Sequence, residues 1–175
     1  MVFPAERRAG VNPDSLDQKQ PSQGLTHEDL VNLVGHNYQQ LIFEPLKRLK
    51  IAHNISELEF KSPTGVHLNS DGNYIVEQIF GKHRVFAYRL GKGVRTSYHQ
   101  HLVELNLSEH YFLLRGEMDL TVGGSVQRLD EKNNSTTVFP GNFHQGKSNA
   151  DNTLVLVIMP DSSHIPYEQL HAPSE

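Results

Sequence analysis

From residue 58 onward, short runs rich in apolar and β-branched residues alternate with clusters of turn-forming residues. Gly, Asn, Asp and Pro separate the runs, as in Asp71-Gly72 and Gly123-Gly124. Many short strands at close spacing predict an all-β sandwich or barrel over residues 57–160. We expect strands at Leu58–Lys61, Asn73–Phe80, Arg84–Leu90, Arg95–His101, Glu109–Leu114, Met118–Val122, Val126–Leu129, Thr136–Phe139 and Leu154–Met159.

The preceding segment, residues 25–56, has a helical pattern instead. Thr26 is suited to cap a helix N-terminus, and two acidic residues follow in the first turn, where the helix dipole favours them. Gly35 weakens the middle of this helix, and Pro45 is expected to kink or end it. We expect the segment to pack on the outside of the β domain, and support of a dimer interface is the alternative. The helical stripe consists of Leu30, Val31, Leu33, Val34, Tyr38, Leu41 and Ile42.

The two ends of the chain have no such periodicity. Residues 1–24 are rich in polar residues and contain three prolines, which predicts a flexible N-terminal arm. Residues 161–175 form a polar, proline-containing C-terminal tail. The chain is therefore expected to be one β domain of ordinary size with an arm, a helical segment and a tail.

Composition and charge limit the classes of function. The net charge is −4 and no long basic run is present, which argues against nucleic acid or an anionic membrane surface as the main partner. No stretch has the roughly 18 apolar residues needed to span a bilayer, and the N-terminus has no apolar signal-peptide core, so we expect a cytoplasmic protein. Cysteine is absent, which excludes disulfides and thiolate ligands. A metal site would have to use oxygen ligands and some of the 11 histidines.

Candidate chemistry is concentrated in one stretch of the β-rich region. His99 and His101 are one residue apart, so on a strand both side chains point to the same face. Glu109 follows a few residues later, Glu104 is a rival carboxylate, and His144 supplies a third imidazole. Imidazoles and a carboxylate that converge on one point are suitable ligands for a divalent metal.

This stretch resembles the two sequence motifs of the cupin superfamily. In the first motif five residues separate a glycine from His-x-His, and six residues separate a later glutamate from a second glycine. Gly93 and His99 have the first spacing, and Glu109 and Gly116 have the second. The segment 140–144, which reads Pro-Gly-Asn-Phe-His, resembles the second motif. The seven residues between His-x-His and Glu109 are more than the usual three or four.

The resemblance implies a fold and a ligand set. The fold is the cupin double-stranded β-helix, a jelly-roll barrel with an inward face that can hold a metal. One divalent transition metal, Fe, Mn, Zn or Ni, would be bound by His99, His101, Glu109 and His144, with Glu109 favoured over Glu104 because of its distance to Gly116. Cupins commonly pair as dimers through edge strands, so we expect a homodimer. The long loop, residues 102–108, is predicted to shape the mouth of the cavity.

The resemblance also suggests a reaction. Gly72-Asn73-Tyr74, Lys82-His83-Arg84-Val85 and Ser108-Glu109-His110-Tyr111 resemble the barrel of type II mannose-6-phosphate isomerases. That likeness implies a metal that polarises a sugar carbonyl and hydroxyl, with a small polar molecule as the substrate.

Several roles stay open at this point. Glu109 and Tyr111, which share a strand face, are the candidate catalytic residues, although a packed core residue is the favoured interpretation of Tyr111. The alternatives to an isomerase are an Fe(II)-dependent dioxygenase, a cupin lyase and a non-catalytic ligand-binding cupin. Arg95, Arg115 and Gln127 could meet an anionic substrate, but a position at a solvated strand end is the favoured interpretation of each.

Overall fold

The computed structural model describes residue 31 and residues 35–58, 64–67 and 74–162. This part of the chain contains one α-helix, α2 (Tyr38–Arg48), and two 3-10 turns, η2 (Ile55–Glu57) and η3 (Val103–Leu105). The strands are β1 (Thr64–His67), β2 (Tyr74–Phe80), β3 (His83–Leu90), β4 (Glu109–Arg115), β5 (Met118–Val122), β6 (Ser125–Leu129), β7 (Ser135–Val138), β8 (His144–Ser148) and β9 (Thr153–Pro160).

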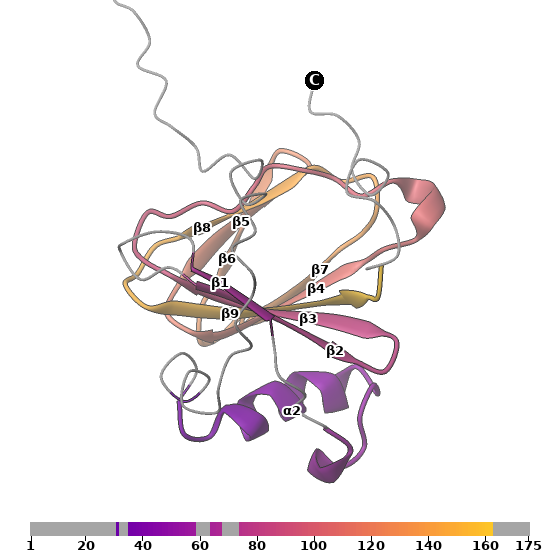
Figure 1. The fold of residues 1–175 in the computed structure, drawn as a ribbon. Helices are drawn as coiled ribbons and strands as arrows, with labels where there is room; N and C mark the ends of the chain where they lie inside the picture. Colours follow the sequence, from indigo (N-terminus) through magenta and orange to yellow (C-terminus); the bar gives the residue numbers. More distant parts are fainter. Residues whose placement is uncertain (1–30, 32–34, 59–63, 68–73, 163–175) are drawn as a thin grey trace, which may run out of the picture.

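The strands form two antiparallel sheets that face each other as a jelly-roll barrel (Figure 1). The larger sheet has the order β1-β2-β3-β9-β4-β7, and the smaller sheet has the order β6-β5-β8. Helix α2 lies on the outer face of the larger sheet (Figure 1). The predicted all-β architecture with an N-terminal helical appendage is confirmed.

The alternation of side chains along β9 explains how one strand serves two cores. Leu154, Leu156 and Ile158 are buried in the apolar cluster beneath α2. Val155 and Val157 point the other way and are buried in the barrel interior. Because both faces of β9 are covered, its sequence is apolar almost throughout, and successive side chains divide between the two clusters.

Helix α2 is held against the larger sheet by its apolar side. Tyr38, Ile42, Phe43 and Leu46 are buried in the same cluster as Phe112 of β4. Packing of this face explains why the short helix is stable, because isolated helices of this length are marginal in water.

The start of the helix differs from the prediction. Gly35 has a φ of 115°, which is outside the right-handed helical range, and α2 begins only at Tyr38. Gly35 thus lies before this helix and not in its middle. The expected N-terminal cap, Thr26, lies outside the described residues.

Of the two effects predicted for Pro45, ending the helix is not observed, since α2 continues to Arg48, and a kink stays a prediction. Proline removes the N–H that would bond to the carbonyl of Leu41, and its ring crowds that carbonyl. Pro45 and Leu46 are both buried, and their packing offsets the lost hydrogen bond.

One predicted strand and two unpredicted strands differ from the expectation, and one further prediction lies mostly outside the described residues. The Arg95–His101 stretch is not a regular strand but an extended segment with isolated bridges to β8. Strands β1 and β8 have no counterpart among the predicted runs. The sequence of β8 is His-Gln-Gly-Lys-Ser, which lacks apolar residues because its buried positions are His144, Gly146 and Ser148. Of the predicted strand Leu58–Lys61, Leu58 is in no strand and the rest lies outside the described residues.

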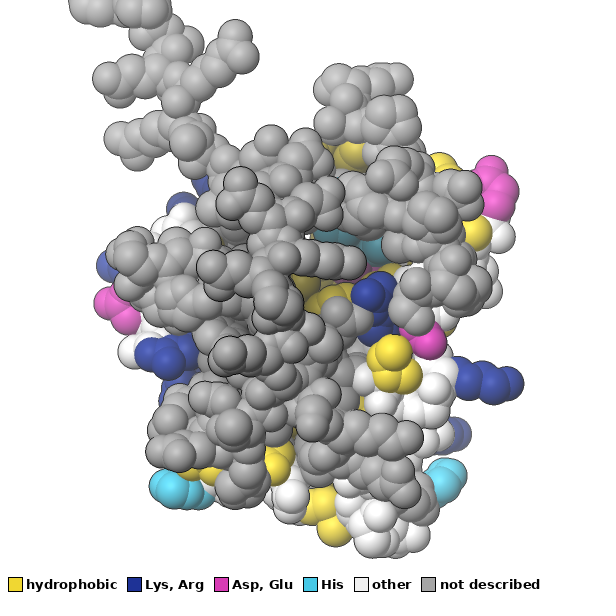
Figure 2. All heavy atoms as spheres, viewed as in Figure 1, with side chains coloured by type: hydrophobic (Ala, Val, Ile, Leu, Met, Phe, Trp, Pro, Cys, Tyr) yellow, Lys and Arg dark blue, Asp and Glu magenta, His cyan; other side chains and the backbone are white. Residues whose placement is uncertain are grey.

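The described part of the chain has no long apolar helix, and its viewed surface carries mixed charge. No helix within the described ranges is long and apolar enough to cross a membrane. On the face viewed in Figure 2, the described Lys and Arg side chains are interspersed with acidic and neutral ones.

Candidate metal centre

The four predicted metal ligands come from three parts of the barrel. Glu109 begins β4 in the larger sheet, and His144 begins β8 in the smaller sheet. His99 and His101 lie on the irregular segment that pairs with β8. The backbone N–H of His99 donates to the backbone carbonyl of His144 at 3.2 Å, and the backbone N–H of His144 donates to the backbone carbonyl of His99 at 2.8 Å. This pairing brings the two imidazole rings to a centroid distance of 4.3 Å.

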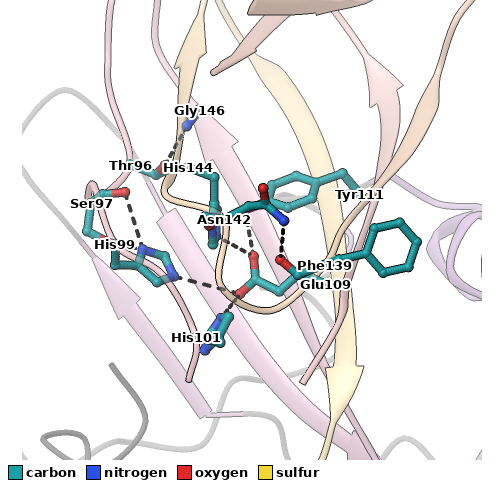
Figure 3. Close-up of polar contacts among 10 residues, drawn as sticks. All are labelled: Thr96, Ser97, His99, His101, Glu109, Tyr111, Phe139, Asn142, His144 and Gly146. Atoms are coloured by element: carbon teal, nitrogen blue, oxygen red, sulfur yellow. Dashed lines mark hydrogen bonds and ion pairs between the residues drawn. The ribbon is translucent and has the colours of Figure 1, made fainter. Parts of the chain in front are cut away.

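The four side chains converge around the Glu109 carboxylate (Figure 3). Nε2 of His101 lies 2.9 Å from Oε1 of Glu109, and Nε2 of His144 lies 2.9 Å from Oε2. Nε2 of His99 is 3.9 Å from Oε1. One potential ligand atom from each residue lies within 4.8 Å of the others, so the group could hold a metal ion. His99 is the most accessible member, with 17% of its side chain exposed.

The structure separates the two candidate carboxylates. Glu109 is buried together with His101 and His144. Glu104 lies on η3, is exposed, and is not part of the converging group. The carboxylate brought together with the three histidines is therefore that of Glu109.

Hydrogen bonds on the far side of two rings set their orientation. Nδ1 of His144 lies 3.0 Å from the Asn142 carbonyl, and Nδ1 of His99 lies 3.1 Å from the Ser97 hydroxyl. Bonds of this kind on the outer nitrogen direct Nε2 toward a common centre, which is the usual arrangement of histidine metal ligands.

The charges of the group favour a cation at its centre. Burial raises the pKa of the Glu109 carboxyl, but hydrogen bonds from His101, His144 and His99 outweigh burial and hold this pKa well below its usual range. Burial lowers the pKa of His144, but its hydrogen bond to Glu109 and the charge of Glu109 outweigh burial and raise the pKa. The metal-free site thus stabilises a proton on His144, and a bound metal would take the place of that positive charge.

Comparison with solved structures identifies the architecture. A cupin-2 domain from Rhodospirillum rubrum is similar over 67% of this chain and 80% of its own length, with a TM-score of 0.50 and 13% sequence identity. The chain has the cupin fold.

Two further solved structures also resemble the chain. A sugar phosphate isomerase of the cupin superfamily from Silicibacter pomeroyi covers 60% of this chain and 75% of its own, with a TM-score of 0.47 and 17% identity. KdgF from Halomonas sp. covers 52% and 84%, with a TM-score of 0.44 and 14% identity. No protein-family model matches the sequence, and no curated protein matches it either.

Within the cupin barrel, Tyr111 contacts the central carboxylate. It shares a face of β4 with Glu109, and its hydroxyl donates to Oε2 of Glu109 at 2.7 Å. Burial and the negative charge of Glu109 raise the pKa of Tyr111 well above its usual value. Tyr111 therefore keeps its proton near neutral pH, which suits hydrogen-bond donation and not proton abstraction.

The long loop, residues 102–108, is anchored to the cupin barrel beside the site. Leu107 is buried against Met159 of β9, with Leu105 and Phe86 packed against the same pair. Val103 is 65% exposed and packs beside Gly141, since a Cβ on that glycine would lie 2.8 Å from the Val103 side chain. The loop thus connects the His101 side of the site with the segment before His144.

Sequence reasoning does not identify the groups that orient the imidazoles. The Ser97 hydroxyl and the Asn142 carbonyl each act on a histidine two residues later in the chain. Their proximity in sequence is a signal, but the bonds depend on local backbone geometry that the sequence pattern does not specify.

Proposed function

We propose that this cupin binds one divalent transition metal through His99, His101, Glu109 and His144 and acts on a small polar molecule. The observation that supports this most directly is the buried convergence of the four donors, whose potential ligand atoms lie within 4.8 Å of one another. Three imidazole nitrogens and one carboxylate oxygen form a donor set suited to Fe, Mn, Zn or Ni.

A metal held by these residues would supply Lewis-acid polarisation of a substrate oxygen. The protein's own groups have separate tasks. Glu109 is anionic and receives bonds from His101, His144 and Tyr111, which hold its carboxylate in one orientation. Tyr111 keeps its proton and stabilises negative charge on Glu109. His99, the most exposed of the four, lies nearest to solvent and to an entering substrate.

For the reaction we propose chemistry of the sugar or sugar-phosphate isomerase type. The support is the sequence likeness to type II mannose-6-phosphate isomerases in Lys82-His83-Arg84-Val85 and Ser108-Glu109-His110-Tyr111. An isomerase also requires a group that moves a proton between neighbouring carbons. Glu109, whose pKa is held well below its usual range, is suited to hold the metal rather than to accept this proton, and the described ligand group contains no second carboxylate. The homodimer and the cytoplasmic location stay predictions.

The experiment that tests the proposal is metal analysis of the purified wild-type chain beside Glu109→Gln and Glu104→Gln. Both variants remove one carboxylate charge, but only Glu109 lies among the histidines. We expect about one equivalent of metal in the wild type and in Glu104→Gln, and an affinity weakened by more than about 100-fold in Glu109→Gln.

The outcome also bears on the reaction. Equal metal content in wild type and Glu109→Gln would refute the site, and absence of metal in the wild type after reconstitution would refute the metal-dependent function. Reconstitution with each metal, followed by an aldose–ketose interconversion assay and an oxygen-uptake assay, separates an isomerase from an Fe(II) dioxygenase.

A further inference from the structure

A groove separate from the metal centre lies between helix α2 and strand β4, on the outer side of the larger sheet that the helix covers (Figure 1). Its volume is about 620 Å³, within the range of roughly 300–1,000 Å³ that is typical of small-molecule sites. One wall is a flank of α2 with Gln40, Glu44 and Arg48, which are each four residues apart and therefore share one side of the helix. The opposite wall is formed by β4 and by Asn134, which precedes β7.

The floor of this groove is apolar. Pro45 and Phe112 are buried, and Leu41 and Leu114 are half-buried residues that pack against the same cluster. Because Leu41 and Leu114 keep part of their surface exposed, a hydrocarbon that lies on them would be withdrawn from water on one side. Glu109 is on the opposite face of β4, so a ligand in the groove would be on the other side of the larger sheet from the metal centre.

Arg48 places a cation beside the apolar floor. Its guanidinium lies over the Phe112 ring, 5.7 Å from the ring centroid. Glu44 precedes Arg48 by the spacing at which helical ion pairs form, but its carboxylate accepts a hydrogen bond from the Gln40 amide instead. In the described part of the chain no ion pair joins Arg48 to an acidic residue. A guanidinium that lies over an aromatic ring keeps its N–H edge available for an anion.

The charges along this flank of α2 favour one negative group near Arg48. Lys47 adds a second cation in the last helical turn, and its ammonium lies over the Phe43 ring, 5.8 Å from the centroid. The C-terminus of a helix carries about half a negative charge, which the two full positive charges outweigh. Glu44 lies one turn before Arg48 and repels further negative charge, so an anion with a single charge suits the groove better than one with two charges.

We propose that this groove binds a small amphipathic carboxylic acid, at a site distinct from the metal centre. The carboxylate would accept two parallel hydrogen bonds from the N–H edge of Arg48, and the hydrocarbon would lie on Leu41, Phe112 and Leu114. Arg48 alone would accept any anion and the floor alone any hydrocarbon, so their combination in one groove selects a molecule that has both parts. The site does not depend on the proposed metal function.

The test is an NMR titration of the purified full-length protein that follows the methyl signals of Leu41 and Leu114. The probes are octanoate, octanol and butyrate. Octanol keeps the apolar body of octanoate without its charge, and butyrate keeps the carboxylate with a shorter body. We expect both methyl signals to shift, and octanoate to bind about tenfold or more tightly than either of the other probes. The groove signals should respond alike in metal-free and Zn²⁺-loaded protein, which separates this site from carboxylate binding at the metal centre.

Three variants assign the binding to the groove. Arg48→Gln should bind octanoate no more tightly than octanol, and Arg48→Lys should keep part of the preference because it keeps the charge. Arg115→Gln is the matched control, since Arg115 is an exposed arginine of β4 that donates to the Asn152 carbonyl and does not line the groove. Arg95, the other arginine considered from the sequence, is also exposed and donates to the Gln145 side chain. Arg48 and Arg115 are both exposed, so we expect their variants to fold.

Three results would overturn the inference. One is an octanoate affinity of Arg48→Gln equal to that of the wild type, and another is the absence of a shift in both methyl signals. The third is broadening of these signals with protein concentration before any probe is added, together with a dimer in light scattering, because a second copy of the chain would then occupy the groove. Loss of the octanoate preference in Arg48→Gln, with the preference intact in Arg115→Gln, would support the site.

Discussion

The hydrogen bond from Tyr111 to Glu109 allows a sharp test of how the metal centre is held. The substitution Tyr111→Phe removes one oxygen and keeps the buried ring. The lost bond is 2.7 Å long, has a charged acceptor and lies in a residue that is only 4% exposed. A buried hydrogen bond to a charged group contributes about 1.5–3 kcal/mol. We therefore expect the free energy of unfolding of the metal-free variant to be lower than that of the metal-free wild type by about that amount.

The same bond orients the proposed metal ligand. Removal of a hydrogen bond that orients a metal-ligating side chain typically weakens metal binding by about 10–100-fold. We therefore expect Tyr111→Phe to fold, to retain all four donors and to bind metal about 10–100-fold more weakly. The assay is a competition titration against a chelator of known affinity, combined with urea unfolding of the metal-free protein.

Tyr98→Phe is the matched control. Tyr98 is 51% exposed and stacks on Phe143 with the ring centroids 5.2 Å apart, away from the carboxylate. We expect its metal affinity and stability to match those of the wild type. A metal affinity of Tyr111→Phe within twofold of the wild type would refute the orienting role. A loss of stability with unchanged metal affinity would show that Tyr111 acts only as a packed core residue.

Two further predictions concern pH and packing. In the metal-free protein the pKa of His144 is raised, so its pairing with Glu109 stabilises the fold below about pH 6.5 and loses this effect as the pH rises through the folded-state pKa. Proton NMR should show a His144 titration midpoint above 6.5 in the wild type and a lower one in Glu109→Gln, and equal midpoints would contradict the coupling. Gly146→Ala places a Cβ 1.9 Å from the Met118 Cε, and because Met118 is fully buried we expect urea unfolding to show a loss of about 1–3 kcal/mol. An unchanged unfolding midpoint would show that Met118 moves aside at no cost.

The sequence was sufficient for the strands that carry an apolar run or an alternating apolar pattern. Strands β4, β5 and β9 lie close to their predicted ranges because most of their inward residues are buried hydrophobics. The pattern fails at β8, where the buried positions hold histidine, glycine and serine. When the inward residues of a strand are metal-ligand candidates or small residues in close packing, its sequence has no hydrophobic pattern from which the strand can be predicted.

The same reasoning explains what could be predicted of the site. His99, His101, Glu109 and His144 were identifiable from residue type and spacing, and the structure brings them together. The isolated bridges of the His99 segment were not predictable, because pairing with β8 depends on a strand without a periodic signal.

The distribution of the four donors over both sheets has a mechanical consequence. Glu109 belongs to the larger sheet, whereas His144 belongs to the smaller one. A cation bound by both would act as a reversible cross-link between the two halves of the sandwich, in a chain that has no cysteine and hence no disulfide. Separation of the sheets would then require release of the cation, so the rate of unfolding would depend on the lifetime of the metal–ligand bonds. The site would in this way hold the two sheets together as well as carry out a reaction, and removal of the metal by a chelator would speed unfolding of the barrel.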